Sequence, residues 1–368
     1  MELHFLDIID LLVVYQGLFI FFFLSYKAKD APHHTLWLGG FVLTISLDYL
    51  NTFFFSSKLV LNYPNLAFLF NGMPLLAGPL LYLYVCARTK QMIISWANLA
   101  LHSIPFSLVT IWSILRFYTL SAQDQLQFLI QPSEAQAWEI RLIVVGGFIQ
   151  ILIYLSLSFK QLFTYRKQLK NYFSSIEKVN LNWLLNLVIG FSVLVLLNLL
   201  KNFWEVAVIF EVMYQLVGLT TLAYLNVMLL KILERQELID FQQLNQQQEG
   251  AMVEDLTPII ERVHALLSKE RLFTDATLTI SKLADQLPYS SRQISTAINK
   301  GLGTNFYELI NKRRIEEAKT MLIQTGELKK SISEIMFEIG FNSKSSFNTA
   351  FKKYTGQTPS AFRRQMGK

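Results

Sequence analysis

The chain has 368 residues, of which 52% are hydrophobic and only 16% are charged. Soluble domains usually carry about a quarter charged residues, and this composition excludes a disordered or collagen-like chain. The single cysteine, Cys86, excludes a framework of intrachain disulfides.

The charge is unevenly distributed between the two parts of the chain. Residues 1–254 hold 15 Lys/Arg and 16 Asp/Glu, whereas residues 255–368 hold 18 Lys/Arg and 11 Asp/Glu. The first part is therefore apolar and nearly neutral, and the second is polar and basic. This pattern predicts a lipid environment for the first part and a polyanionic partner for the second.

Seven apolar runs, each of about the 20 residues needed to cross ~30 Å of hydrocarbon, fill the first part. Seven such runs in 230 residues exclude ordinary buried helices, so residues 1–230 are predicted to form a seven-transmembrane-helix sensor domain. The acidic flank of the first run (Glu2, Asp7, Asp10) is not that of a cleaved signal peptide. The expected spans are 8–26, 35–56, 66–87, 93–115, 139–159, 181–200 and 206–230.

Basic residues in the connecting segments predict the orientation. The segments after the first, third and fifth runs hold nine Lys/Arg, and the opposite side holds three, or four with Arg141. By the positive-inside rule, the N-terminus lies outside and the C-terminus in the cytoplasm.

Residues 231–254 form a polar, Gln-rich linker that is predicted to stay helical to about Gly250. Two interpretations are open: a solvated connector helix, or a short coiled-coil seam that would favour a dimer. The seam would consist of residues at 3–4 spacing: Leu230, Leu233, Glu237, Phe241 and Leu244.

Residues 255–368 show only helical periodicity, with two helix-turn-helix units. In the first, Thr279 and Ser290 are expected to cap helices on either side of a turn at Pro288, with the second helix at 291–300. In the second, which begins at Ser331, Gly340 permits the turn, Phe341 fills the core, and Ser343 caps a helix over 344–354. A longer helix over 305–324 joins the units.

A helix-turn-helix places its second helix in the major groove of DNA. Two units in one chain would read two successive groove segments about one helical turn (~34 Å) apart. The fold class is therefore all-α: a seven-transmembrane-helix bundle followed by a C-terminal double helix-turn-helix DNA-binding domain.

Residues 332–364 strongly resemble the signature of the AraC/XylS family of bacterial transcription regulators, and 313–322 resemble the family's linker helix. Met336 departs from the pattern, because the family usually has Ala there. The resemblance covers about 110 residues but not the membrane part, and the whole arrangement is similar to membrane-anchored members of this family. The matching positions are Ile332, Ile335, Glu338, Gly340, Phe341, Ser343, Ser345, Phe347, Phe351, Lys352, Lys353, Gly356, Thr358, Pro359, Phe362 and Arg363.

Arg314 is expected on the surface of the joining helix, as an ion-pair partner of Glu316 or Glu317.

The resemblance implies which residues face DNA; for each, the alternative is that the residue lies on a solvated helix face. Base-contacting residues are expected to be Arg292, Ser295, Thr296, Lys344, Ser345, Asn348 and Thr349, whose chemistry suits base edges. Phosphate partners are expected to be Lys300, Lys312, Arg313, Lys352, Lys353, Arg363 and Arg364.

Polar residues inside the spans are candidates for a sensor pocket, because such residues are costly in lipid. The alternative is that they only pair with one another, for example Arg141 with Glu211 or Lys201 with Asp48, or reach the interface. His102 is expected to be a packing residue and not a metal ligand. The candidate pocket, open to the outside, consists of Asp48, Asn51, Arg141, Lys201, Glu205 and Glu211.

The sequence has no phosphate-binding loop, nucleophile elbow or kinase signature, so we expect no enzyme activity and no cofactor or metal. The predicted function is a one-component transcription regulator of the bacterial inner membrane, with the signal passing through the seventh span and the linker. Its expected partners are double-stranded DNA, the lipid bilayer and a small-molecule or membrane signal, with RNA polymerase and a second copy as further candidates. Activation and repression are both open. The alternative is a membrane transporter or scaffold whose basic domain is a docking module.

Overall fold

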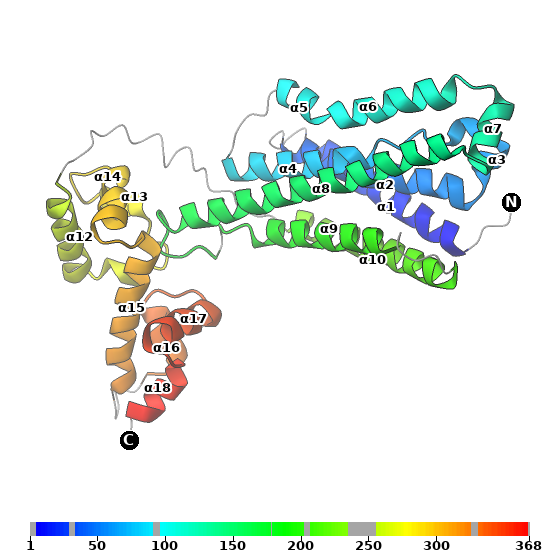
Figure 1. Cartoon of the computed structure of the whole chain (residues 1–368). Coiled ribbons are helices and arrows are strands. Elements are labelled where there is room, and N and C mark those ends of the chain that lie inside the picture. The colour runs from blue at the N-terminus through cyan, green and yellow to red at the C-terminus, as the bar shows by residue number, and fades with distance from the viewer. Residues whose placement is uncertain are drawn as a thin grey trace. The chain divides into compact units, whose positions relative to one another are not determined.

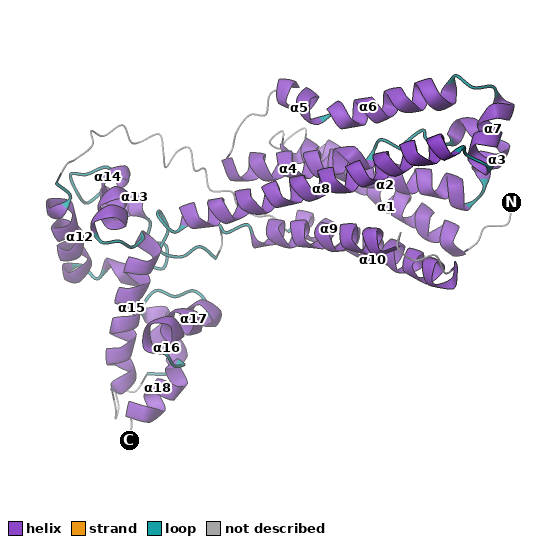
Figure 2. Ribbon diagram, in the orientation of Figure 1, coloured by secondary structure: helices purple, strands orange, loops and turns teal. Residues whose placement is uncertain are grey.

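The structure is a computed structural model that describes residues 5–28, 34–90, 96–177, 179–201, 207–234, 255–324 and 330–366. Helices make up most of these residues, and no named strand occurs among them (Figure 2). The predicted all-α class is confirmed. The chain divides into two compact units, Met1–Phe163 with Leu181–Gln236, and Thr164–Asn180 with Glu237–Lys368. Residues 164–180, placed in the membrane domain from the sequence, thus group with the C-terminal unit.

The first unit is built from apolar helices. α1 packs against α2 and α10, α2 packs against α4, and α9 packs against α10. The helices are α1 (Phe5–Lys27), α2 (His34–Ser56), α3 (Leu59–Asn62), α4 (Pro74–Lys90), α5 (Trp96–His102), α6 (Ile104–Ser113), α7 (Ala122–Ile130), α8 (Glu134–Leu169), α9 (Asn182–Lys201) and α10 (Ala207–Leu233), with a 3₁₀ turn at Pro64–Leu66 and a π-helical turn at Ile114–Tyr118 (Figure 1).

Five of the described helices are long and apolar enough to cross a membrane, or six with one bent pair, whereas the sequence predicted seven spans. The predicted run 66–87 is not one helix, because α4 starts only at Pro74 and has 17 residues. The run 93–115 is divided between α5 and α6, with Pro105 in the first turn of α6. Proline is tolerated in the first turn of a helix but breaks or kinks a helix interior. Each run is therefore interrupted where a new helix starts at a proline: Pro74 for the first run and Pro105 for the second. The five helices contain Asp7–Lys27, Thr35–Ser56, Glu134–Leu169, Asn182–Lys201 and Ile209–Leu233, and the bent pair is Ile104–Tyr118 with Ala122–Ile130.

Buried carboxylates in this unit are stabilised by hydroxyl groups. Ser56 donates a hydrogen bond to Asp7 over 2.8 Å, and Tyr214 donates one to Asp10 over 2.6 Å. These bonds offset part of the cost of burying a carboxylate. They also join α1 to α2 and α10 near the start of α1.

The second unit contains two helical lobes that share one long helix, α15. The first half of α15 contributes Phe306 and Ile310 to one core, and its second half contributes Ile315 and Leu322 to the other. Each helix-turn-helix unit therefore has its own apolar core. The helices are α12 (Thr257–Lys269), α13 (Ile280–Ala284), α14 (Ser291–Thr296), α15 (Phe306–Ile323), α16 (Ile332–Glu338), α17 (Lys344–Thr355) and α18 (Pro359–Met366).

The predicted caps of this unit are confirmed. Thr279, Ser290 and Ser343 each accept a hydrogen bond from a first-turn amide, and Ser290 and Ser331 form complete capping boxes. These bonds satisfy amides that have no partner within a helix. The second helix of the first unit is shorter than predicted, since α14 ends at Thr296 and a π-helical turn follows over Ala297–Gly301.

The predicted linker helix is described only at its start. α10 ends at Leu233, and residues 235–254 lie outside the described residues. The predicted seam positions Glu237, Phe241 and Leu244 fall in that segment.

Candidate nucleic-acid interface

In each helix-turn-helix unit we call the second helix, α14 in the first unit and α17 in the second, the recognition helix. The second recognition helix, α17, presents an exposed polar face. Phe347, Ala350 and Phe351 are buried on the opposite face in the core of the second lobe. Arg, Lys and Asn side chains can bind guanine or adenine edges, and a Thr methyl can contact thymine. The predicted base-contacting residues of this helix, Lys344, Ser345, Asn348 and Thr349, are all exposed.

The first recognition helix, α14, agrees with the prediction less completely. Arg292 is exposed and Thr296 is half-buried. Ser295 is only 7% exposed, and its hydroxyl accepts a hydrogen bond from the Asn299 amide over 3.2 Å. The Ser295 hydroxyl thus binds within the lobe in this structure, and its role as a base contact stays a prediction.

The predicted phosphate partners fall into two groups. Two of these basic side chains already have a partner within the protein. Lys353 pairs with Glu308 at 2.5 Å, and Arg363 donates a hydrogen bond to the carbonyl of Lys330 over 2.7 Å. Burial alone would raise the pKa of the Glu308 carboxyl, but hydrogen bonds from Lys353 and Tyr354 bring it below its ordinary value. The exposed cations that form no ion pair among the described residues are Lys300, Lys312, Arg313, Lys352 and Arg364.

Arg314 is not the surface residue that its sequence neighbours suggested. It is 1% exposed, and it donates hydrogen bonds to the carbonyls of Phe273 and Asp275 over 2.6 and 2.8 Å. Its expected partners are occupied elsewhere, because Glu317 pairs with Arg271 and Glu316 with Lys319. Arg314 is thus a core residue that ties α15 to the segment before α13.

Comparison with known proteins identifies this region. The family described as "Helix-turn-helix domain" matches residues 283–365. Residues 283–365 form an AraC-type helix-turn-helix domain. An uncharacterised HTH-type transcriptional regulator of Staphylococcus aureus strain COL is 32% identical over 103 residues, which are 28% of this chain and 13% of that protein. An uncharacterised HTH-type transcriptional regulator of Pseudoalteromonas carrageenovora is 41% identical over 76 residues, 21% of this chain and 40% of that protein.

The chain therefore spans less than half of the length of these relatives. No solved structure matches it. The likeness covers the AraC-type domain and supports DNA binding by it.

The segment between α8 and α9 packs against the AraC-type domain and the residues just before it, which the sequence did not predict. The Ser174 amide donates to the carbonyl of Leu278 over 3.1 Å, and the Ile280 amide donates to the carbonyl of Tyr172 over 2.9 Å. Further along, the Tyr307 amide donates to the carbonyl of Lys170 over 2.9 Å. We call residues 170–177 the docked loop, because its backbone is joined both to the start of α13 and to α15.

The docked loop also reaches the second recognition helix. The carboxylate of Glu177 accepts hydrogen bonds from the hydroxyls of Ser343, over 2.8 Å, and Ser346. Ser343 is the N-cap of α17, so this carboxylate lies at the helix end expected to approach base edges. Nothing in the local sequence around Glu177 indicates this contact.

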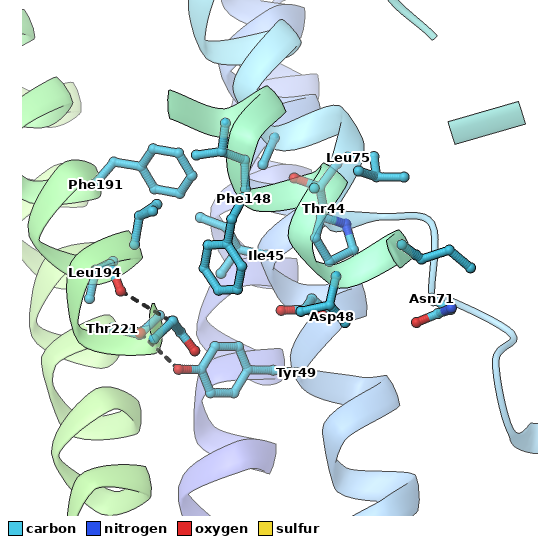
Figure 3. A pocket seen from close by; sticks show the side chains of 18 residues that line it. Thr44, Ile45, Asp48, Tyr49, Asn71, Leu75, Phe148, Phe191, Leu194 and Thr221 are labelled. Carbon is cyan, nitrogen blue, oxygen red and sulfur yellow. Dashed lines mark hydrogen bonds between the residues drawn. The ribbon is translucent and has the colours of Figure 1, made fainter. Parts of the chain in front are cut away.

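The first unit contains a cavity of about 290 Å³ between α2, α4, α8, α9 and α10 (Figure 3). Of the five predicted pocket residues that the structure describes, Asp48 alone lines it. Asn51 is partly buried away from the lining, and its amide oxygen has no partner among the described residues. The lining adds five polar residues outside the predicted set: Thr44, Tyr49, Asn71, Asn198 and Thr221.

The remaining predicted pocket residues lie elsewhere. Arg141 is exposed with its guanidinium 5.8 Å from the Trp138 ring centre, and Glu211 is exposed. Lys201 lies over the Tyr214 ring at 5.2 Å, and Glu205 is outside the described residues. Within the described part, no ion pair joins Arg141 to Glu211 or Lys201 to Asp48. His102 does behave as a packing residue, with a 2.6 Å hydrogen bond to Tyr154.

Proposed function

We propose that this chain is a membrane-bound, one-component transcription regulator. The observation that carries the proposal is the presence of an AraC-type domain and several membrane-length apolar helices in one polypeptide. The similarity to proteins named as HTH-type transcriptional regulators supports the regulatory role. We place the chain in a bacterial inner membrane with its C-terminal domain in the cytoplasm, as the basic residues of the connecting segments favour.

The surface of the first unit supports a lipid environment. Along α8, large apolar side chains such as Leu142, Val145, Ile149 and Ile153 are more than half exposed. Extended apolar surfaces of this kind are rare on soluble monomers and typical of lipid-facing helices. The cavity inside the same unit is a candidate place for the signal to bind.

A double variant, Arg292→Ala plus Lys344→Ala, in the full-length chain in lipid nanodiscs tests the proposal. It removes the two basic side chains that are predicted to contact bases. Each good base contact contributes about 1–3 kcal/mol of discrimination. We expect affinity for a specific site to fall by at least about 30-fold, while salt-dependent binding to random DNA persists. Footprinting or fluorescence anisotropy measures both.

The matched control is Lys269→Ala with Lys319→Ala, which removes the same charge from α12 and α15. We expect only a small loss of affinity, equal for specific and random DNA. If the two double variants lose specific binding equally, α14 and α17 are not the reading elements.

A further inference from the structure

The cavity of the first unit has one strongly polar end. Figure 3 shows Asp48, Tyr49 and Thr221 on one side and the apolar side chains of Phe191 and Leu75 on the other. The Tyr49 and Thr221 hydroxyls bind each other at 2.8 Å. Asp48 has no such partner: no hydrogen bond or ion pair to its carboxylate is formed among the described residues.

Within the described part of the chain, the charged groups that line the cavity are of negative sign only. Its lining includes the carboxylate of Asp48 and, among the described residues, no Lys, Arg or His. Lys201 is close enough to attract Asp48 electrostatically, but it is not part of the lining and lies over the Tyr214 ring. An anionic ligand would be repelled here, whereas a cation would find a carboxylate in a low-dielectric setting, where its attraction is strong.

The size of the cavity restricts the ligand. A cavity of about 290 Å³ is many times larger than the space that a single water molecule needs, so it can hold a small organic molecule. A small amphiphile fits, with a polar head at Asp48 and an apolar chain against Phe148 and Phe191. We propose that the cavity binds a protonated primary amine on a short apolar chain, with the ammonium on Asp48. This inference rests on the proposed function only in treating that amine as the signal.

Photolabelling of the full-length chain in lipid nanodiscs tests this assignment. The probes are octylamine and octanoate, each with a photoreactive diazirine on the chain, so that both enter the bilayer. We expect the amine probe to label cavity residues at least tenfold more than the carboxylate probe does. Asp48→Asn should abolish this preference. Unlabelled octylamine should compete, and octanol should not.

Asp10→Asn is the matched control, because Asp10 is a buried carboxylate of the same unit that does not line the cavity. It should keep the preference for the amine. Equal labelling by both probes, or a preference that survives Asp48→Asn, would overturn the proposal. The readout is occupancy and not DNA binding, so failure of this inference is distinct from failure of the proposed function.

A second inference comes from the docked loop, on independent observations. The loop connects α8 to α9 in the chain, and its backbone is hydrogen-bonded to Leu278 and Ile280, just before the AraC-type domain, and to Tyr307 within it. The guanidinium of Arg314 donates to the Ser174 hydroxyl over 3.2 Å. The docked loop is thus a second connection between the apolar helices and the DNA-binding part: it is covalently continuous with α8 and hydrogen-bonded to the helix-turn-helix lobes, whereas the 231–254 linker is a covalent connection.

The loop lies beside both recognition helices. Burial raises the pKa of the Tyr172 hydroxyl, and the nearby charge of Arg292 on α14 acts against that rise. Glu177 places a carboxylate at the first turn of α17, where the helix dipole and the Ser343 and Ser346 hydroxyls stabilise an anion. DNA phosphates are bound by the same kind of group, hydroxyls and helix N-termini.

We infer that the docked loop holds the AraC-type domain in a state of low DNA affinity. Glu177 and a DNA phosphate compete for the first turn of α17, and the carboxylate also repels the phosphates near Lys344. A movement of α8 or α9 that withdraws the loop releases this helix end. The inference deepens the proposed function by naming the contact through which a membrane signal acts.

Glu177→Gln in the full-length chain in nanodiscs tests the competition. Allosteric couplings typically amount to 5–150-fold in affinity, and we expect at least about fivefold tighter binding to the specific site. Glu177→Ala should act in the same direction. Glu316→Gln is the matched control, because it removes one negative charge from an exposed site on α15.

Hydrogen exchange of the α15 and α17 amides should stay unchanged in both Glu177 variants, which shows that the fold is intact. Binding no tighter than that of Glu316→Gln would overturn the inference, as would weaker binding. If the wild type itself binds no specific site, the proposed function fails and this inference fails with it. If the wild type binds a specific site but the Glu177 variants do not bind it more tightly, only the inference fails.

Discussion

Gly340→Ala is expected to disrupt the second helix-turn-helix lobe more than any other small substitution in the domain. Gly340 has φ +89°, and a Cβ there would lie 2.5 Å from the carbonyl oxygen of Thr274. A left-handed conformation costs a non-glycine residue about 1–3 kcal/mol. The overlap adds to this, because its partner is a backbone atom whose position is fixed by the turn Leu272–Thr274.

We expect a loss of at least about 3 kcal/mol in the stability of this lobe, from strain and overlap together. Hydrogen exchange of the amides of α16 and α17, followed by mass spectrometry, measures it region by region. Gly356→Ala is the control: its φ is +79°, but a Cβ there would have no neighbour within 4 Å. If both substitutions accelerate exchange equally, close packing of Gly340 against Thr274 is not what matters.

Arg314→Met is expected to have the second large effect, on the junction between the two lobes. Burial lowers the pKa of the Arg314 guanidinium to about 10, so it stays charged at neutral pH. The substitution keeps much of the apolar volume but leaves the Phe273 and Asp275 carbonyls without their donor. An unsatisfied buried polar group costs about 1–3 kcal/mol, so we expect a loss of about 3 kcal/mol.

The same substitution should loosen the docked loop, because Arg314 also donates to Ser174. Exchange of the amides in residues 170–177 should therefore rise together with that of α15. Arg313→Met is the matched control: this side chain is exposed, and its one hydrogen bond within the described part of the chain is to the His264 ring nitrogen, at 3.4 Å. A similar change in both variants would refute a special role for the buried guanidinium.

Local features of the sequence were sufficient to predict much of the second unit. Caps such as Ser290 and Ser343 act within three residues, so a short segment contains all the information needed to place them. The residues expected on the DNA-facing side of α17 came from the family resemblance, and in the structure all four are exposed. Helix ends were less predictable where proline interrupted an apolar run, as at Pro74.

Most of the features that were missed depend on distant parts of the chain. Arg314 has acidic neighbours on its own helix, yet its partners are carbonyls about 40 residues earlier. Ser295 was assigned to the DNA face from the family resemblance, but its hydroxyl faces Asn299. Glu177 meets Ser343 across 166 residues, and one acidic residue in a basic loop gives no local signal of such a contact. Of the predicted pocket residues, the structure places Asp48 on the cavity; polarity alone does not show which side of a helix faces a cavity.

The central claim is that an AraC-type domain attached to membrane helices reads specific DNA from the membrane. Immunoprecipitation of the full-length chain after in-cell crosslinking, with nucleotide-resolution footprints, tests this most directly. The account predicts discrete sites in which two protected major-groove segments lie about one helical turn apart, recovered from the membrane fraction and lost with Arg292→Ala plus Lys344→Ala. Uniform recovery of genomic DNA without footprints, or sites unaffected by that double variant, would contradict it.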